Sequence, residues 1–215
     1  MKILAMSDLH GYLPNVGENK YDLLIIAGDV VPLELQSNVY LSYCWLSQEF
    51  KMWCDSIDVE MVVVVPGNHD FVFEQMKNWY KIGDKINVLI NRKIEFQGKT
   101  IFGCPYTTMD CWAFRREKYR TYKKMIPKGV DILVMHQPPL YDGLGMVEHG
   151  NGDIKEFGSS KLTERIAEVK PDLVLCGHIH TGNHSDVRMG ETRLYNVSLL
   201  DEHYRVRFHP KCIIL

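Results

Sequence analysis

The segment at residues 61–70, MVVVVPGNHD, constrains the fold of this chain more than any other. It contains four consecutive valines, which are β-branched, and Pro66 and Gly67 end the run. Such a run is typical of a strand that is buried on both faces, in the middle of a covered sheet. The next three residues, Asn-His-Asp, can bind a metal ion or move a proton. Since α/β proteins build sites beyond the carboxyl ends of their strands, the segment predicts a site here.

Four other apolar runs are followed by polar side chains of the same kind. Asp8 and His10 follow the first run, and alternation in an extended segment places them on the same side. The other three runs are 22–27, 131–135 and 172–176, and they are followed by Asp29, by His136 and by the pair His178 and His180. The five runs therefore predict one site assembled from the ends of buried strands.

Between these runs the sequence predicts helices on the outside. Apolar residues from Val39 to Ile57 repeat at spacings of four and three, which indicates one helix with Ser37 or Asn38 as its N-cap. A strand, this helix and the valine strand form a unit with an expected right-handed crossover. A second helix is predicted over Phe71–Ile82. A third follows a loop with five glycines between 143 and 158, and Ser159 or Ser160 is its expected cap.

The remaining segments predict short antiparallel strands. In the middle of the chain these are Asn87–Ile90, Lys93–Phe96 and Thr100–Gly103, with a turn at 97–98. Near the end they are Leu194–Ser198, Tyr204–Phe208 and Cys212–Leu215. Alternation of these strands with strand–helix units predicts an α/β fold of two sheets packed face to face, with helices outside.

Composition limits the possible partners. The 215 residues are 46% hydrophobic and carry a formal charge of −2, so neither nucleic acid nor an anionic membrane is an expected partner. Six cysteines without a CxxC pair are expected to be reduced thiols of a cytoplasmic protein. We expect no signal peptide, and the sequence contains no run of about 20 apolar residues. We expect one soluble domain over 1–215, and the oligomeric state stays open.

The side chains at the five strand ends form a plausible metal-ligand set. They are carboxylates, one amide and imidazoles, without a nearby thiolate, which suits Mn, Fe, Zn or Co. Seven ligands are too many for one ion and enough for two if one carboxylate bridges them. A metal pair of this kind catalyses the in-line displacement of phosphoesters.

Each of these residues also has an ordinary structural explanation when it is taken alone. Asp8 can cap a loop, Asp29 can follow Gly28 in a turn, and Asn68 can occupy a left-handed turn position. Their joint occurrence after five apolar strands favours the metal site. The aromatic and basic segment 106–128 stays open between a packed helix face and a rim that binds an anionic substrate. For the second alternative, the candidates for substrate binding are Asn68, Trp112, Arg115 and Arg116.

The ordered set Asp8-x-His10, Gly28-Asp29, Gly67-Asn68-His69-Asp70, His136 and Gly177-His178-x-His180 resembles the calcineurin-like metallophosphoesterase superfamily. Within it, the chain is similar to the small metallophosphoesterase-domain (MPPED-type) phosphodiesterases. This second similarity is carried by the stretches at 105–114, 136–140, 177–182 and 195–198. The resemblance implies a four-layer α/β/β/α sandwich.

The resemblance also implies roles for single residues. Asp8, His10, Asp29 and His180 would hold one metal ion; Asp29, Asn68, His136 and His178 would hold the other. Manganese is the expected ion, with Fe, Zn, Co or Ni as alternatives, and a metal-bound hydroxide is the implied nucleophile. His69 matches the family's histidine that faces the leaving group. One departure is Pro32, where many members carry an acid that steadies this histidine; Glu34 or Asp70 would have to replace it, or His69 acts unaided. Asp70 is therefore a second catalytic candidate.

The predicted function is a dinuclear-metal phosphodiesterase for small or nucleotide-like substrates. A phosphomonoesterase is the alternative, and its protein-phosphatase subtype is disfavoured because Gly-Asp-Val-Val-Pro at 28–32 lacks that family's Asp-Arg-Gly. A non-catalytic scaffold of the same fold is a further alternative, which the complete set of ligand positions disfavours.

Overall fold

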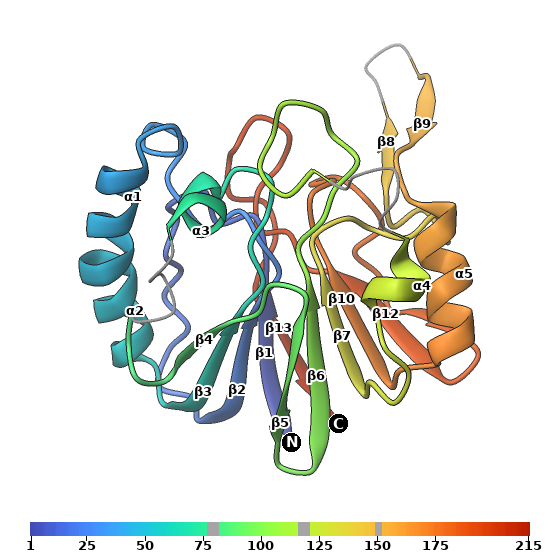
Figure 1. The fold of residues 1–215 in the computed structure, drawn as a ribbon, viewed down its shortest axis with the longest axis horizontal. Helices are drawn as coiled ribbons and strands as arrows, with labels where there is room; N and C mark the ends of the chain where they lie inside the picture. The colour runs from blue at the N-terminus through green and yellow to red at the C-terminus, as the bar shows by residue number, and fades with distance from the viewer. Residues whose placement is uncertain (77–81, 116–120, 149–151) are drawn as a thin grey trace.

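Two β-sheets lie face to face between two helical layers in this computed structural model, which describes residues 1–76, 82–115, 121–148 and 152–215 (Figure 1). Across the first sheet the strands are β13 (Lys211–Ile214), β1 (Lys2–Met6), β2 (Tyr21–Ile26), β3 (Val59–Val64) and β4 (Ile86–Val88). Across the second they are β11 (Val187–Met189), β12 (Thr192–Asn196), β10 (Leu173–Cys176), β7 (Ile132–Met135), β6 (Lys99–Cys104) and β5 (Arg92–Phe96). The predicted four-layer sandwich is confirmed.

The apolar runs are buried on both faces because each sheet has another layer on either side. In β2, Leu23 and Ile25 belong to the core between the two sheets, which also contains Leu175 of β10. Leu24 and Ile26 point the other way, into the core beneath the first helical layer. Alternate side chains of a strand point to opposite faces, so a strand covered on both sides needs an uninterrupted apolar run.

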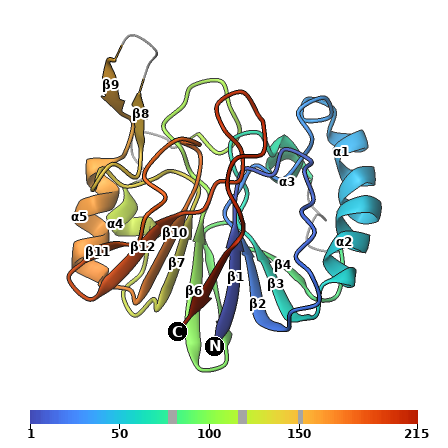
Figure 2. The ribbon, with the colours of Figure 1, turned by 180° about the vertical axis from the view of Figure 1, so that it is seen from behind.

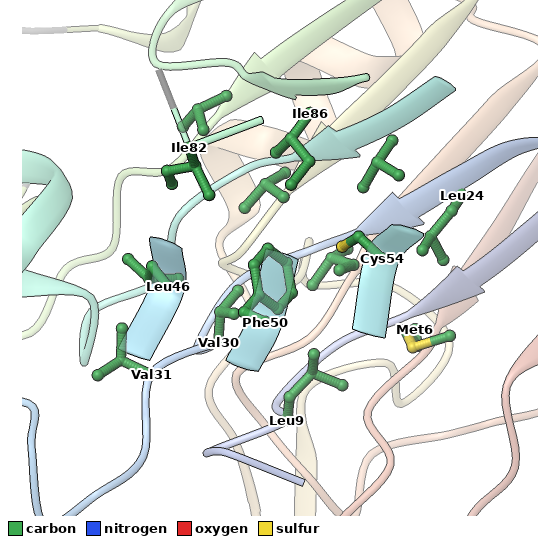
Figure 3. Close-up of a cluster of buried hydrophobic side chains, with 14 of the residues drawn as sticks. Met6, Leu9, Leu24, Val30, Val31, Leu46, Phe50, Cys54, Ile82 and Ile86 are labelled. Carbon is green, nitrogen blue, oxygen red and sulfur yellow. The ribbon is translucent and has the colours of Figure 1, made fainter. Parts of the chain in front are cut away.

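The first helical layer follows the predicted stripe. It consists of α1 (Val39–Trp45), a π-helical segment η1 (Leu46–Phe50) and α2 (Lys51–Ser56), and Asn38 caps it by accepting a hydrogen bond from Leu41 N at 3.1 Å. Figure 3 shows Leu46, Phe50 and Cys54 pointing from this layer toward the first sheet. The second helical layer contains α4 (Tyr122–Met125) and α5 (Ser160–Val169), and Ser159 caps α5 as predicted.

Some predicted elements are wrong. The helix predicted over 71–82 is the short α3 (Phe71–Gln75), and residues 77–81 of that prediction lie outside the described residues. The strand predicted at 87–90 is β4, which runs parallel to β3, while β5 and β6 form the expected hairpin in the second sheet. Local pattern carries no information about which sheet a short strand joins.

The end of the chain also differs from prediction. The strand predicted at 194–198 is β12, which pairs parallel with β10 and antiparallel only with β11. The segment 204–208 is a loop with a single bridge between Leu200 and Val206, because the Asp201 carboxylate accepts hydrogen bonds from two backbone amides there. Within the glycine-rich loop, β8 (Met146–Glu148) and β9 (Ile154–Glu156) form a hairpin that projects from the molecule (Figure 1).

Strand register brings the motif loops to one edge. Met6, Ile26 and Val64, the last residues of β1, β2 and β3, are aligned in parallel pairs. In the second sheet β7 and β10 are also parallel, and a bridge between Ser7 and Ser198 joins the upper ends of the two sheets. The termini lie together at the opposite end of the sheets (Figure 2). Among the helices of the described residues, none has the length and apolar character needed to cross a bilayer.

Candidate metal centre

The centre of the site is the buried carboxylate of Asp29. Its Oδ2 atom lies 3.2 Å from Nε2 of His136, 3.7 Å from Nε2 of His10 and 3.9 Å from Nε2 of His69. Its Oδ1 atom accepts a hydrogen bond from the His69 backbone N–H at 2.8 Å. One carboxylate therefore faces imidazoles from the ends of β1, β3 and β7 at once.

Asp8 is a second buried carboxylate of the site, and it lies next to His178 and His180. Both of its oxygens lie 3.1 Å from the donating His178 backbone N–H, and Ser198 Oγ is 2.6 Å from Oδ2. Its Oδ1 atom is 3.3 Å from Nε2 of His180. Ligand atoms of Asp8, His10 and His180 lie within 4.8 Å of one another, as do those of Asp8, Asp29 and His136. These two groups share Asp8 and together contain five of the seven predicted metal ligands.

Two imidazoles are oriented by backbone carbonyls. Nδ1 of His136 is 2.8 Å from the Ala27 oxygen, and Nδ1 of His180 is 2.8 Å from the Asp201 oxygen. A carbonyl only accepts, so the proton of each ring is on Nδ1 and Nε2 is turned toward the carboxylates. This is the arrangement in which histidine presents a lone pair to a metal ion.

The donor set fits divalent cations. Nε2 of His136 faces two oxygens, Asn68 Oδ1 at 3.0 Å and Asp29 Oδ2 at 3.2 Å. Because the nitrogen and both oxygens carry lone pairs, they repel one another unless a proton or a metal ion lies among them. Neither ring nitrogen of His10 has a hydrogen-bond partner although both are buried. A buried polar atom without a partner is costly, and coordination satisfies it.

The electrostatics of the site also favour bound cations. Burial opposes a charge on His136 and on His180, but the carboxylates of Asp29 and Asp8 outweigh it and raise the pKa of each imidazole to about 9. Burial likewise opposes a charge on Asp29, yet the neighbouring His136 holds the pKa of this carboxyl far below its usual range. Without metal, protons occupy the positions at Nε2 where metal ions would bind.

The other two imidazoles are neutral ligand candidates. Burial lowers the pKa of His10 to about 4, against the opposing effect of Asp29. Burial, together with the charge of His136, lowers the pKa of His178 to about 3. At neutral pH both rings are unprotonated, which is the form that coordinates a metal ion.

The backbone is strained where it presents these groups. Asp8, His10, Asp29 and His178 all have positive φ, between 43° and 70°. Such a conformation is unfavourable for residues with a Cβ atom and is typical of functional sites. Close packing adds a second constraint, since a Cβ atom on Gly67 would lie 2.1 Å from Asp29 Oδ1. Only glycine leaves room for the central carboxylate at this position.

The sequence matches the profile of the calcineurin-like phosphoesterases over residues 1–182. The chain belongs to this family. It is therefore a metal-dependent phosphoesterase of a family that uses two metal ions. Metallophosphoesterase domain-containing protein 1 of Homo sapiens is 25% identical over 95% of this chain and 68% of its own length. An uncharacterized protein of Methanocaldococcus jannaschii is 28% identical over 92% of this chain and 88% of its own length.

Solved structures share the fold of this phosphoesterase. The phosphopantetheinyl hydrolase of Mycobacterium tuberculosis has a TM-score of 0.61 and 15% identity, and the match covers 94% of this chain and 90% of that one. A putative 5′-nucleotidase of Staphylococcus aureus has a TM-score of 0.55 and 14% identity, covering 99% of this chain and 53% of that one. At these identities the similarity shows the fold alone.

His69 of the phosphoesterase contacts a residue that the sequence did not indicate. Its Nδ1 atom is in hydrogen-bond contact with Oε1 of Gln36. Gln36 comes close because the turn after Pro32 folds back, with Leu35 N and Gln36 N both donating to the Pro32 carbonyl. In the sequence, the only indication of this contact was that Gln36 is polar and lies one helical turn after Pro32. Glu34, one of the two predicted substitutes, is exposed.

Asp70, the second catalytic candidate, is hydrogen-bonded to backbone. Its Oδ1 atom accepts from Val30 N and Val31 N at 2.9 and 3.0 Å, and its Oδ2 atom accepts from Gly67 N at 2.9 Å. Burial and the nearby Asp29 carboxylate raise the pKa of Asp70 to about 7. These contacts connect the loop after β2 with the loop after β3. The residue whose side chain contacts the His69 ring nitrogen Nδ1 is Gln36 and not Asp70.

The predicted substrate-binding residues lie in different places. The Trp112 ring is 4.3 Å from the His69 ring, and its loop is attached to the motif through Ala113 N, which donates to the Asn68 carbonyl. Arg115 is exposed and paired with Asp110, and Arg116 lies outside the described residues. The structure therefore brings Trp112 and Asn68 to the site.

Tyr204 is a further residue at the site that sequence reasoning missed. Its ring lies 4.9 Å from the His10 ring and 5.6 Å from the His180 ring, nearly perpendicular to both. Burial and the Asp29 and Asp8 carboxylates raise the pKa of its hydroxyl, which is therefore protonated at neutral pH. The sequence did not predict Tyr204 at the site, because the alternation of residues 204–208 predicted a strand there instead of a loop.

Proposed function

We propose that this phosphoesterase hydrolyses small or nucleotide-like phosphodiesters at a centre of two divalent ions. The observation that carries the proposal is the position of the Asp29 carboxylate, 3.2 to 3.9 Å from three imidazoles that come from three strand ends. A bridging carboxylate holds two ions at the separation that an in-line displacement needs.

The ligands divide into two sets that share Asp29. We assign Asp8, His10, Asp29 and His180 to one ion, and Asp29, Asn68, His136 and His178 to the other. When bound, divalent ions supply Lewis acidity to the phosphoryl oxygens and lower the pKa of the attacking water. Manganese is the expected ion because carboxylate, amide and imidazole ligands without thiolate suit it; Fe, Zn, Co and Ni are the alternatives.

His69 is the proposed proton donor to the leaving group. Its ring adjoins Asp29 and Trp112, so an ester group leaving on this side meets both an imidazole and an aromatic surface. Gln36 is the positioning residue that holds Nδ1 of His69. An amide can accept from Nδ1 or donate to it, so Gln36 supports a charged ring or a neutral ring with the proton on Nε2. A carboxylate at this place would support only a proton on Nδ1.

The charge of the site supports a diester over a monoester. Among the residues that the structure describes, the side chains named above around Asp29 are carboxylates, imidazoles, the amides of Asn68 and Gln36, and aromatic rings, without lysine or arginine. A phosphomonoester dianion carries one more negative charge than a diester and needs correspondingly more positive charge around it. A diester also has two organic groups, and the aromatic ring of Trp112 offers a surface for one of them.

The test is a comparison of diesters with monoesters on metal-loaded protein. Chelated protein is reloaded with Mn²⁺, its metal content is measured, and kcat/KM is determined for bis-p-nitrophenyl phosphate, p-nitrophenyl phosphate and 2′,3′- and 3′,5′-cyclic nucleotides. We expect higher kcat/KM for a diester than for the monoester. A monoester preference would favour the phosphomonoesterase alternative, and no hydrolysis with two ions bound would favour a scaffold.

A further inference from the structure

A pocket of about 200 Å³ adjoins the metal centre, and His69 is not among the residues that line it. It lies next to His178 and His180, and its outer wall is formed by Val147 of the projecting hairpin together with Thr181, Glu202 and Tyr204. No residue that lines it has a role in the mechanism proposed above, apart from the two metal ligands. The pocket is therefore next to two of the predicted metal ligands.

Tyr204 and Trp112 lie at the two ends of a row of contacting rings. The Trp112 ring is 4.3 Å from the His69 ring, the His69 ring is 4.8 Å from the His10 ring, and the His10 ring is 4.9 Å from the Tyr204 ring. One predicted metal ligand, His10, and the proposed proton donor, His69, thus separate the two aromatic side chains. A phosphoryl group bound over the middle of this row has one aromatic ring on each side.

The loop that carries Tyr204 is fixed to the metal centre. Asp201 Oδ1 accepts from His203 N and Arg205 N at 2.9 and 3.0 Å, and the Asp201 carbonyl accepts from both Tyr204 N and His180 Nδ1. Tyr204 itself has a φ of 59°, so the loop holds a conformation that is unfavourable for tyrosine. Tyr204 is 43% exposed and thus accessible to a ligand.

We propose that the pocket between Val147 and Tyr204 binds the second ester group of the substrate, the group that stays on phosphorus when the other leaves past His69 and Trp112. The inference rests on the proposed phosphodiesterase function and defines its substrate class. The second group is uncharged and aromatic or apolar, since Val147 and the Tyr204 ring supply apolar surface. The exposed Glu202 carboxylate at the rim disfavours a second anionic group.

Binding of non-hydrolysable phosphinates tests the pocket without requiring turnover. Diphenylphosphinate and methyl(phenyl)phosphinate carry the same charge and differ in one aryl arm. Their affinities for the Mn²⁺-loaded protein are measured by calorimetry. In the wild type we expect diphenylphosphinate to bind about two- to tenfold more tightly, the range expected for one aromatic pair.

Four variants locate this preference. Tyr204→Ala removes the aromatic wall, and Val147→Trp fills the pocket from the side of the β8–β9 hairpin, so both should abolish the preference. Tyr204→Phe keeps the ring and should retain it. Tyr40→Ala, which removes a 71% exposed tyrosine of α1, is the matched control and should also retain it. Metal content is measured for each variant.

The outcomes separate the pocket from the activity. Equal affinity of the two phosphinates in the wild type, or a preference that survives in both Tyr204→Ala and Val147→Trp, overturns the proposal. Loss of metal in Tyr204→Ala with an unchanged preference in Val147→Trp also overturns it, because Tyr204 then serves the ligands. A monoester preference in turnover, with a phosphinate preference that depends on Tyr204, refutes the diesterase function and leaves the pocket standing.

Discussion

Ser198→Ala tests whether Asp8 is a metal ligand or a structural carboxylate. Ser198 is 1% exposed and its Oγ lies 2.6 Å from Oδ2 of Asp8, which is fully buried. The serine also lies 2.9 Å from Asn196 Oδ1, so its removal leaves two buried oxygens with one donor fewer. A hydrogen bond to a charged group contributes about 1.5–3 kcal/mol, and we expect the free energy of unfolding of the metal-free protein to fall by that amount.

The same change should weaken metal binding. Loss of an outer partner of a metal ligand typically reduces affinity about 10- to 100-fold. Urea unfolding of metal-free protein measures the first effect, and calorimetric titration with Mn²⁺ measures the second. Ser47→Ala is the control, because its hydroxyl donates to the Cys44 carbonyl within the first helical layer, and it should change stability by less than about 0.5 kcal/mol.

Two results would refute this reasoning in different ways. Reduced stability with unchanged Mn²⁺ affinity would mean that Asp8 is structural and that the first ion, if present, is held without it. Unchanged stability and affinity would mean that the contact between Ser198 and Asp8 does not form in solution.

The other predictions concern the metals, the bridge, the proton donor and pH. Exhaustive chelation should abolish hydrolysis and Mn²⁺ should restore it; full activity of protein shown by elemental analysis to be metal-free would rule out the two-metal mechanism. Asp29→Asn should reduce kcat more than Asp8→Asn, because a bridge serves both ions; equal losses with two ions still bound to the Asp29 variant would exclude the bridging role. His69→Ala should lose little kcat/KM on bis-p-nitrophenyl phosphate but about 10²–10⁴-fold on a nucleotide diester, whose alkoxide needs a proton. An equal loss on both substrates would show that His69 does not act as the acid. Mn²⁺ affinity should increase as the pH rises from 7 to 9, because protons leave His136 and His180 over that range, where each has a pKa of about 9. Calorimetry in buffers of different ionisation enthalpy measures the released protons, and a titration without proton release would contradict their role as ligands.

The sequence by itself determined the architecture near the site. A strand covered on both faces needs an uninterrupted apolar run, and the residue after such a run lies at the carboxyl end of the strand. These local rules were enough to predict β1, β2, β3, β7 and β10, and to predict that the polar residues following them meet at one edge. The sequence also narrowed each helix cap to two neighbouring residues, Ser37 or Asn38 and Ser159 or Ser160, because a cap is a contact between residues three apart; the structure shows Asn38 and Ser159 as the caps.

Only the tertiary structure decided the partners of those residues. Ser198 is 190 positions from Asp8, and Gln36 is 33 positions from His69, so no local pattern links them. Tyr204 lies over His10 because the Asp201 carboxylate folds the last loop into a turn, whereas its alternation alone predicted a strand. Periodicity reports which face of an element is buried. Which distant side chain meets that face depends on packing and on hydrogen bonds that form only when the two sheets come together.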